Sequence, residues 1–334
     1  MNTIFRKGMG RQIGLAAASI LLAASVIATA AFADDAKKFK IIFVSPLGPG
    51  NQFMLPMIKG FQEAGQQLGL DVTFRGNQET NDFAAAPVVK RLLEDAIATK
   101  PDAIVVSDQY PDVLNGDIKQ AVSDGIPVVL TNGGYGEEGN VGALAFVGTA
   151  ERDLGQLGAQ KLCGLGAKNV LVVTLPPGIP LVDLRMEGIA KGIAPCKTTI
   201  IQVPQETLFD ATKLVNTMLV AIQKDPTIDG VFSLGSCCGP AMVALVDQLG
   251  DKAKSMHFGT IDLGAPVLDA LKNGKVDFAI DQQQYLEGYM PVVILNNYLK
   301  FSISPVDTFV RTGPGLVTKD NAEKIIGLTA QNYR

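Results

Sequence analysis

The regular alternation of short apolar segments with helix-like segments is the feature that most constrains how this chain can fold. In a first run, buried strands are predicted at 39–45, 70–74, 101–107, 125–131 and 143–148, with helical patterns between them. From residue 151 the alternation restarts, with strands predicted at 169–174, 198–203, 230–234, 256–261 and 276–281. Strict alternation indicates parallel strands covered by helices, and two runs indicate two sheets. We therefore expect an α/β fold of two doubly wound parallel-sheet lobes.

Residues 1–33 have the three parts of an export signal. Arg6, Lys7 and Arg11 form a basic start, 13–27 is apolar and rich in alanine, and Ala31-Phe-Ala33 is a small-x-small cleavage pattern. A membrane anchor is the alternative, but the apolar part is shorter than the roughly 20 residues that a span needs. We expect cleavage after Ala33 and a soluble mature protein in the periplasm.

Length and charge limit the partners. The chain of 334 residues is long enough for two domains of about 150 residues each. Its formal charge of −4 becomes more negative once the basic signal is removed. Neither nucleic acid nor an anionic membrane would attract such a protein.

The chain offers little for catalysis or for metal binding. His257 is the only histidine, and the cysteine spacings match no zinc pattern. The glycine-rich stretches fit neither the dinucleotide-binding nor the phosphate-loop pattern. We therefore expect a protein that is not an enzyme and that has no metal and no cofactor.

The four cysteines are Cys163, Cys196, Cys237 and Cys238. An oxidising compartment such as the periplasm permits disulfides. Cys163 ends one predicted helix and Cys196 follows another, so these two are candidates for a bridge.

Polar side chains follow several predicted strands. Asn51 follows the first strand, Asn132 the fourth and Asp262 the strand 256–261, while Asp281 and Gln282 end the strand 276–281. Ligands of open α/β sheets bind at the carboxyl ends of the strands, and these side chains offer the donors and acceptors that sugar hydroxyls need.

Aromatic residues in the adjoining segments, namely Phe53, Phe209 and Tyr285, can stack on sugar rings. The alternative is that each polar residue only caps a helix or makes a turn. Their joint appearance at several strand ends favours a sugar site.

With these features the chain resembles the periplasmic sugar-binding proteins of ABC-type importers, of the ribose-binding type, from Phe39 to about Ala322. The resemblance rests on segments that occur in the order of the family: Asn51 to Gly60, Gly125 to Asn132, Arg185 to Gly188, Phe209-Asp210, His257 to Asp262, Asp281 to Gly288 and Thr312 to Asn321. It implies that Arg185 donates to sugar oxygens and that Phe209 makes an aromatic contact. Asn51, Phe53, Met54, Asn132, Ser236, Asp262, Asp281, Gln282 and Tyr285 complete the implied ligand site.

The resemblance also implies two lobes that close over a ligand about three crossings, near Gly148, Gln282 and Asp307. The N-terminal lobe would comprise 34–149 and 283–308, and the C-terminal lobe 150–282 and 309–334. A monomer of this kind would deliver a sugar or polyol to the membrane permease of an ABC importer.

Three departures from the ribose-binding type argue against ribose itself. The chain has Asn132-Gly133 where that type has Asp-Arg, and Met54 replaces a stacking aromatic residue. The loop after the strand 230–234 reads Gly-Ser-Cys-Cys-Gly in place of Asn-Asp. Cys237 and Cys238 form either a vicinal disulfide that faces the cleft or two buried thiols at a helix start.

Two other functions are compatible with the sequence. A binding protein of this type can present its loaded form to a chemoreceptor or sensor kinase, and the sequence does not separate this role from import. A secreted carbohydrate-active enzyme would turn over the sugar that it binds. We do not expect a transcription repressor of the same fold, because the chain has an export signal and no DNA-binding helices before Phe39.

Overall fold

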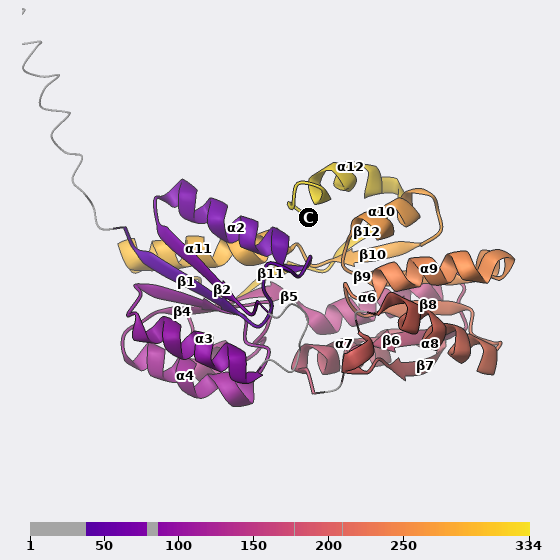
Figure 1. Ribbon diagram of the computed structural model, residues 1–334, viewed down its shortest axis with the longest axis horizontal. Coiled ribbons are helices and arrows are strands. Elements are labelled where there is room, and N and C mark those ends of the chain that lie inside the picture. The colour runs from indigo at the N-terminus through magenta and orange to yellow at the C-terminus, as the bar shows by residue number, and fades with distance from the viewer. Residues whose placement is uncertain (1–37, 79–85, 177, 209) are drawn as a thin grey trace, which may run out of the picture. The chain divides into compact units, whose positions relative to one another are not determined.

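The computed structural model describes residues 38–78, 86–176, 178–208 and 210–334. The predicted signal peptide and Phe209 lie outside these residues. Both runs of alternating strands and helices are present (Figure 1).

The first run leads from β1 to β5. Its elements are β1 (Lys40–Ser45), α2 (Met54–Leu68), β2 (Asp71–Gly76), α3 (Ala86–Ala98), β3 (Ala103–Val106), α4 (Pro111–Ser123), β4 (Val128–Thr131), α5 (Glu138–Val141) and β5 (Phe146–Thr149).

The second run leads from α6 to β10. Its helices are α6 (Glu151–Leu165), α7 (Pro180–Gly192), α8 (Ala211–Lys224), α9 (Gly239–Leu249) and α10 (Ala265–Lys272), with short 3-10 turns at Gln205–Thr207 and Gly250–Ser255. Its strands are β6 (Asn169–Thr174), β7 (Lys197–Gln202), β8 (Gly230–Ser233), β9 (His257–Ile261) and β10 (Phe278–Asp281). The chain ends with α11 (Gln284–Phe301), β11 (Phe309–Gly313), β12 (Gly315–Thr318) and α12 (Lys319–Thr329).

The two sheets have six strands each and the same strand order. The first is β2-β1-β3-β4-β5-β11, and the second is β7-β6-β8-β9-β10-β12. The strand pairs of the first sheet are parallel. In the second sheet β12 alone runs antiparallel to its neighbour, β10. The predicted fold of two doubly wound sheets is confirmed.

Successive residues of each strand face opposite helix layers. In β1, Ile42 and Val44 belong to the apolar cluster formed with α3 and α4, whereas Ile41 and Phe43 pack with α2 and α11. The second sheet repeats this arrangement, with α6 and α7 on one face and α8, α9, α10 and α12 on the other. Burial on both faces explains why inner strands such as β3 are apolar without interruption, whereas the edge strands β2 and β7 carry polar, exposed residues.

The chain passes between the two sheets three times within the compact unit Phe39–Arg334. The first passage joins β5 to α6 and the second joins β10 to α11. The third joins β11 to β12 at Pro314.

The expectation that all of 309–334 belongs with the second sheet, with a crossing near Asp307, is wrong for β11. This strand pairs with β5 in the first sheet. The ring of Phe309 lies 5.0 Å from that of Tyr135 and 5.7 Å from that of Phe146, which places it in the first apolar core. Apolar burial of Phe309 therefore holds β11 on the first sheet.

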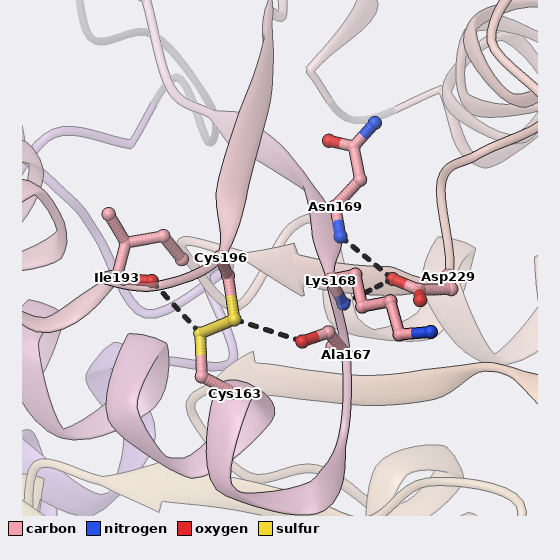
Figure 2. Close-up of a disulfide and its surroundings, with 7 residues drawn as sticks. All are labelled: Cys163, Ala167, Lys168, Asn169, Ile193, Cys196 and Asp229. Atoms are coloured by element: carbon pink, nitrogen blue, oxygen red, sulfur yellow. Dashed lines mark hydrogen bonds between the residues drawn. A yellow bond between two sulfur atoms is a disulfide. The ribbon is translucent and has the colours of Figure 1, made fainter.

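A disulfide joins Cys163, near the end of α6, to Cys196, directly before β7 (Figure 2). This is the pair for which the sequence predicts a bridge. Close by, the Asp229 carboxylate accepts hydrogen bonds from the backbone N–H groups of Lys168 and Asn169 at the start of β6. The disulfide therefore attaches the edge strand β7 to the helix layer that covers its sheet.

Candidate functional site

A cavity of about 50 Å³ lies where loops and helices that follow the strands of the two sheets come together. Residues predicted from the sequence to bind ligand form much of its lining, namely Asn51, Phe53, Asn132, Arg185, Ser236, Asp262 and Gln282. Leu47, Gln109, Leu175, Leu181, Gly235 and Cys237 complete the lining. The structure therefore brings together predicted residues from Asn51 to Gln282 at one place between the two sheets.

Two larger spaces adjoin this cavity. One of about 800 Å³ shares Asn51, Phe53, Ser236, Cys237 and Asp262 with it. Another of about 200 Å³ shares Gln109, Asn132 and Leu181. The space around these side chains is therefore larger than the small cavity alone.

Three predicted ligand residues do not line the small cavity. Met54 is buried in the core beneath α2. Asp281 is fully buried and forms an ion pair with Arg334, and the Tyr285 hydroxyl donates to the Glu63 carboxylate at 2.8 Å. Contacts of these three with a ligand stay predictions, as does that of Phe209, which lies outside the described residues.

Asn132 and Asp262 occupy matching positions in the two sheets. Each directly follows the fourth strand of its run, β4 and β9 respectively, and each has a left-handed backbone, with φ of 60° and 72°. Asn and Asp adopt this conformation more readily than other residues with a Cβ. Backbones held in it are concentrated at binding sites, where the fold supports the strain.

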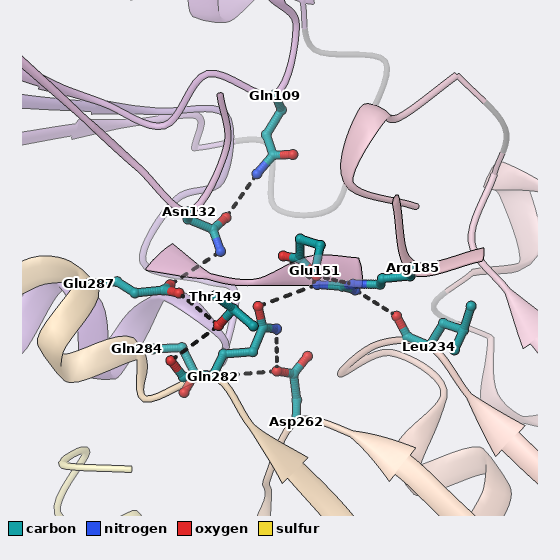
Figure 3. A network of polar contacts seen from close by, with 10 residues as sticks. All are labelled: Gln109, Asn132, Thr149, Glu151, Arg185, Leu234, Asp262, Gln282, Gln284 and Glu287. Atoms are coloured by element: carbon teal, nitrogen blue, oxygen red, sulfur yellow. Dashed lines mark hydrogen bonds and ion pairs between the residues drawn. The ribbon is translucent and has the colours of Figure 1, made fainter. Parts of the chain in front are cut away.

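Gln282 connects the groups on the side of the second sheet (Figure 3). Its Nε2 donates to Asp262 Oδ1 at 2.7 Å, and its Oε1 accepts from Arg185 Nη2 at 3.3 Å. Gln284 Nε2 donates to the same Asp262 oxygen at 3.2 Å. A residue between the two lobes therefore orients both a carboxylate and a guanidinium of the second lobe.

Arg185 uses most of its donors within the protein. Its Nε and Nη2 donate to the two Glu151 carboxylate oxygens at 2.7 and 3.2 Å, and its Nη1 donates to the Leu234 carbonyl at 2.9 Å. Burial opposes the charged form of Arg185, but the Glu151 carboxylate more than offsets it, so the pKa of Arg185 is raised. These bonds and the one to Gln282 use four of its five N–H groups and leave one Nη1 hydrogen over.

A second chain of hydrogen bonds starts on the first sheet. Gln109 Nε2 donates to Asn132 Oδ1 at 2.8 Å, and Asn132 Nδ2 donates to Glu287 Oε2 at 3.2 Å (Figure 3). All three side chains are buried. The Asn132 amide is therefore held on both its oxygen and its nitrogen, which fixes its orientation.

Burial shifts the acid–base behaviour of the carboxyl groups. Burial raises the pKa of Asp262 to about 6, although the Arg185 charge opposes the shift. Burial, together with the nearby Glu151 and Asp262 charges, raises the pKa of Glu287 well above its ordinary value. Carboxyl groups poised in this way can both donate to and accept from hydroxyls.

Cys237 and Cys238 are free thiols whose sulfur atoms lie 3.0 Å apart. Contact with Cys238 and burial raise the pKa of the Cys237 thiol well above its ordinary value. Cys237 lines the small cavity, so a soft apolar surface faces the polar side chains there.

The sequence did not single out Gln109 and Glu287. Gln109 lies in the loop after β3, three residues beyond Val106, so a search of the whole loop after each strand could have found it. Glu287 lies within α11 and carries no such signal, because its partners come from distant strands.

In the part of the chain that the structure describes, no group of histidine, cysteine and acidic residues could hold a metal ion, and no helix is long and apolar enough to span a membrane.

Comparisons with known proteins agree with this geometry. Residues 42–302 match the family model described as periplasmic binding protein domain. The chain is 24% identical over 299 residues to the xylose/arabinose-binding protein of Sulfolobus acidocaldarius, covering 85% of this chain and 72% of that protein. Its structure is similar to that of a carbohydrate transporter of Acidothermus cellulolyticus in complex with myo-inositol, with a TM-score of 0.78, 27% identity and coverage of 89% and 100% of the two chains.

A solute-binding protein of Burkholderia graminis in complex with D-arabinose also has a similar fold, with a TM-score of 0.74 and 22% identity. That match covers 86% of this chain and 98% of the other.

Proposed function

The chain belongs to the periplasmic binding protein family, and we propose that it captures a sugar or polyol between its two lobes and delivers it to an ABC importer. The observation that carries this proposal is the set of buried polar side chains from both sheets around one cavity, with Asn132 and Asp262 in matching positions. The family match agrees with the prediction that the protein is not an enzyme.

The donors and acceptors of the cavity suit a neutral ligand rich in hydroxyls. Asn51, Asn132 and Gln282 offer amides, Ser236 a hydroxyl and Asp262 a carboxyl, and each hydroxyl of a sugar is both a donor and an acceptor. The relatives include proteins described as binding xylose, arabinose and myo-inositol, which favours a pentose or a cyclic polyol over a larger oligosaccharide.

We infer that capture closes the lobes about the three crossings. Asn51 and Asn132 come from the first sheet, and Ser236 and Asp262 come from the second. A ligand that contacts both groups is bound better in the closed state, so it shifts the equilibrium toward that state. The same proposal has five further parts: the division into lobes, the export signal, action in the periplasm, the monomeric state and the permease partner.

A thermal-shift screen of the mature protein tests the proposal. The panel should contain D-xylose, L-arabinose, D-ribose, D-fructose, D-galactose and myo-inositol. A ligand at about 100 times its dissociation constant should add roughly 2.7 kcal/mol of stability. The absence of a shift with every sugar and polyol would contradict the proposed function.

Variants of the lining test the site itself. Asn132→Ala and Asp262→Ala each remove hydrogen bonds to the ligand, so each should weaken binding by about 10- to 100-fold. Asp183→Asn is the matched control, because Asp183 is exposed on α7 and does not line the cavity. If both alanine variants bind as the control does, the assigned site is wrong even where the ligand class is right.

A further inference from the structure

Glu287 is a buried carboxyl group that contacts both a ligand-site residue and the crossings between the sheets. Its side chain is 0% exposed, in the first turn of α11. Among the described residues it forms no ion pair. Its hydrogen-bond partners are neutral donors from three separate strand ends.

The partners of Glu287 cover all three crossings. Thr149 Oγ1, at the end of β5, lies 3.5 Å from Glu287 Oε1, and Thr312 Oγ1, in β11, lies 3.3 Å from the same oxygen. The second crossing, residues 282–283, lies directly before α11, the helix that carries Glu287, and its Gln282 carbonyl lies 3.5 Å from Thr149 Oγ1. One carboxyl group therefore links the residues at which the chain passes from sheet to sheet.

The same carboxyl group holds the ligand-site amide. Glu287 Oε2 accepts from Asn132 Nδ2 at 3.2 Å (Figure 3). The Glu287 carbonyl accepts from Thr131 Oγ1 at 2.7 Å. The end of β4 is thus attached to α11 through both the side chain and the backbone of one residue. A shift of Glu287 would turn the Asn132 amide, and a ligand that turns the amide would move Glu287.

We propose that Glu287 is a positioning residue that couples the orientation of Asn132 to the three crossings. This inference rests on the proposed function, because it takes Asn132 as a ligand contact. Glu287 does not line the cavity, so it acts through Asn132 and through the crossings.

The surroundings of Glu287 favour its uncharged form. The charged groups that face it are Glu151 and Asp262, which repel a carboxylate, and Arg185, whose guanidinium is bonded to Glu151. Charges on the adjacent strands are already paired, Asp281 with Arg334 and Arg311 with Asp153. On its own helix, Tyr285 and Tyr289 bond to Glu63 and Gln67 of α2.

Burial raises the pKa of Glu287 in agreement with this geometry. A neutral carboxylic acid can accept from Asn132 and donate its own proton to Thr149 or Thr312. The amide of a glutamine can do the same, with its oxygen toward Asn132 and its nitrogen toward the threonines. Glu287→Gln therefore imitates the uncharged acid, whereas Glu287→Leu removes every side-chain hydrogen bond at similar volume.

The first measurement needs no ligand. Amide hydrogen exchange is followed at 149–151, 281–284 and 312–315 in the wild type, in Glu287→Gln and in Glu287→Leu. We expect faster exchange at all three crossings in Glu287→Leu and wild-type rates in Glu287→Gln. Exchange in Glu287→Leu that is unchanged, or that changes only within α11, would overturn the proposal.

The second measurement is the dissociation constant of the tightest-binding sugar of the panel between pH 5 and pH 8. At pH 5 we expect Glu287→Gln to bind within about threefold of the wild type and Glu287→Leu to bind roughly tenfold more weakly. As the pH rises through the pKa of Glu287, the wild type should lose affinity relative to Glu287→Gln, because only the wild type acquires a charge. Asp262 titrates in both proteins, and in the wild type its charge also opposes ionisation of Glu287.

Glu94→Gln is the matched control, since Glu94 is half-exposed on α3 and makes an ion pair with Lys90. It should leave both the exchange and the pH profile unchanged. A Glu287→Gln variant as weak as Glu287→Leu at pH 5 would overturn the proposal. If the wild type bound no sugar of the panel, the proposed function would fail, and the exchange measurement would still decide whether Glu287 links the crossings.

Discussion

Asp262 illustrates at the scale of one residue how a binding group can lower the stability of the fold. Its carboxyl group is 4% exposed, and burial raises its pKa from 3.8 to about 6. A raised pKa means that the folded state favours the protonated form. The stability that this form contributes is fully present below about pH 4 and is lost as the pH rises to about 6. At pH 7 the ionised group therefore costs the folded state about 3 kcal/mol.

Asp262→Asn should stabilise the protein without ligand at neutral pH. The amide oxygen of the substituted side chain can still accept from Gln282 and Gln284, which both donate to Oδ1 of Asp262. We expect a gain of about 3 kcal/mol at pH 7 that shrinks toward zero below pH 4. Denaturant unfolding at a series of pH values measures it. A gain of the same size at every pH would show that ionisation of Asp262 is not its cause.

Strand-end polarity predicted the residues of the site better than it predicted their roles. Asn51, Asn132, Asp262 and Gln282 do line one cavity, because parallel strands place their carboxyl ends together. The role of Arg185 depends on its ion pair with Glu151, a residue that is distant in sequence and close only in the folded structure. Neither periodicity nor spacing shows such a partner, since it comes from the packing of α6 on α7.

At the scale of secondary-structure elements, close helix pairs set the positions of the site residues. A Cβ on Gly188 of α7 would lie 2.0 Å from the Arg152 carbonyl oxygen of α6, and a Cβ on Gly155 of α6 would lie 2.0 Å from the Arg185 carbonyl oxygen. Gly60 of α2 and Gly288 of α11 form the corresponding contact in the first lobe. The glycines therefore allow the helices that carry Arg185 and Glu287 to approach their neighbours this closely.

Gly188→Ala should separate α6 from α7 and disturb the Arg185–Glu151 ion pair. We expect a loss of about 2–3 kcal/mol of unfolding free energy, which is typical of overpacking, together with weaker sugar binding. Gly116→Ala in α4 is the control, because no atom lies within 4 Å of a Cβ there. It should stabilise the protein by about 0.5–1 kcal/mol, as helix propensity dictates. Chemical unfolding of both variants compares them, and equal effects would contradict the role of close packing.

The sequence predicted the long, regular elements well and the C-terminal ones poorly. The predicted strand 169–174 agrees with β6, and the predicted strands 230–234 and 256–261 differ from β8 and β9 by one residue at one end. β11, β12 and α12 were not predicted as separate elements, because two short strands on either side of Pro314 interrupt the alternation. The sheet to which β11 belongs is decided by the aromatic core around Phe146, which is distant in sequence.

At the scale of the whole molecule, the two halves repeat one plan. The strand orders are the same, and Asn132 and Asp262 occupy matching sites. The closure proposed above would use the three crossings between these halves as its hinge. The lobes themselves can stay rigid, since each has its own apolar layers.

Ligand-induced closure should be visible in solution scattering. Saturating sugar should reduce the radius of gyration of the wild type, because contacts from both lobes favour the closed state. Asp262→Ala should show a smaller change at the same sugar concentration, and Asp183→Asn should behave as the wild type. A wild type that is stabilised by sugar but keeps its radius of gyration would show that binding does not require closure.

The pairing of β11 with β5 has a consequence for the order in which the protein can fold. The first sheet needs a strand that ends at Gly313, and one of its helix layers needs α11. During synthesis from the N-terminus, nearly all residues of the second sheet are therefore made before the first sheet can be completed. Until then β5 presents an unpaired edge, which is a site for aggregation or for chaperone binding. Contacts so distant in sequence also slow folding, so the last strand to arrive determines when the first lobe becomes native.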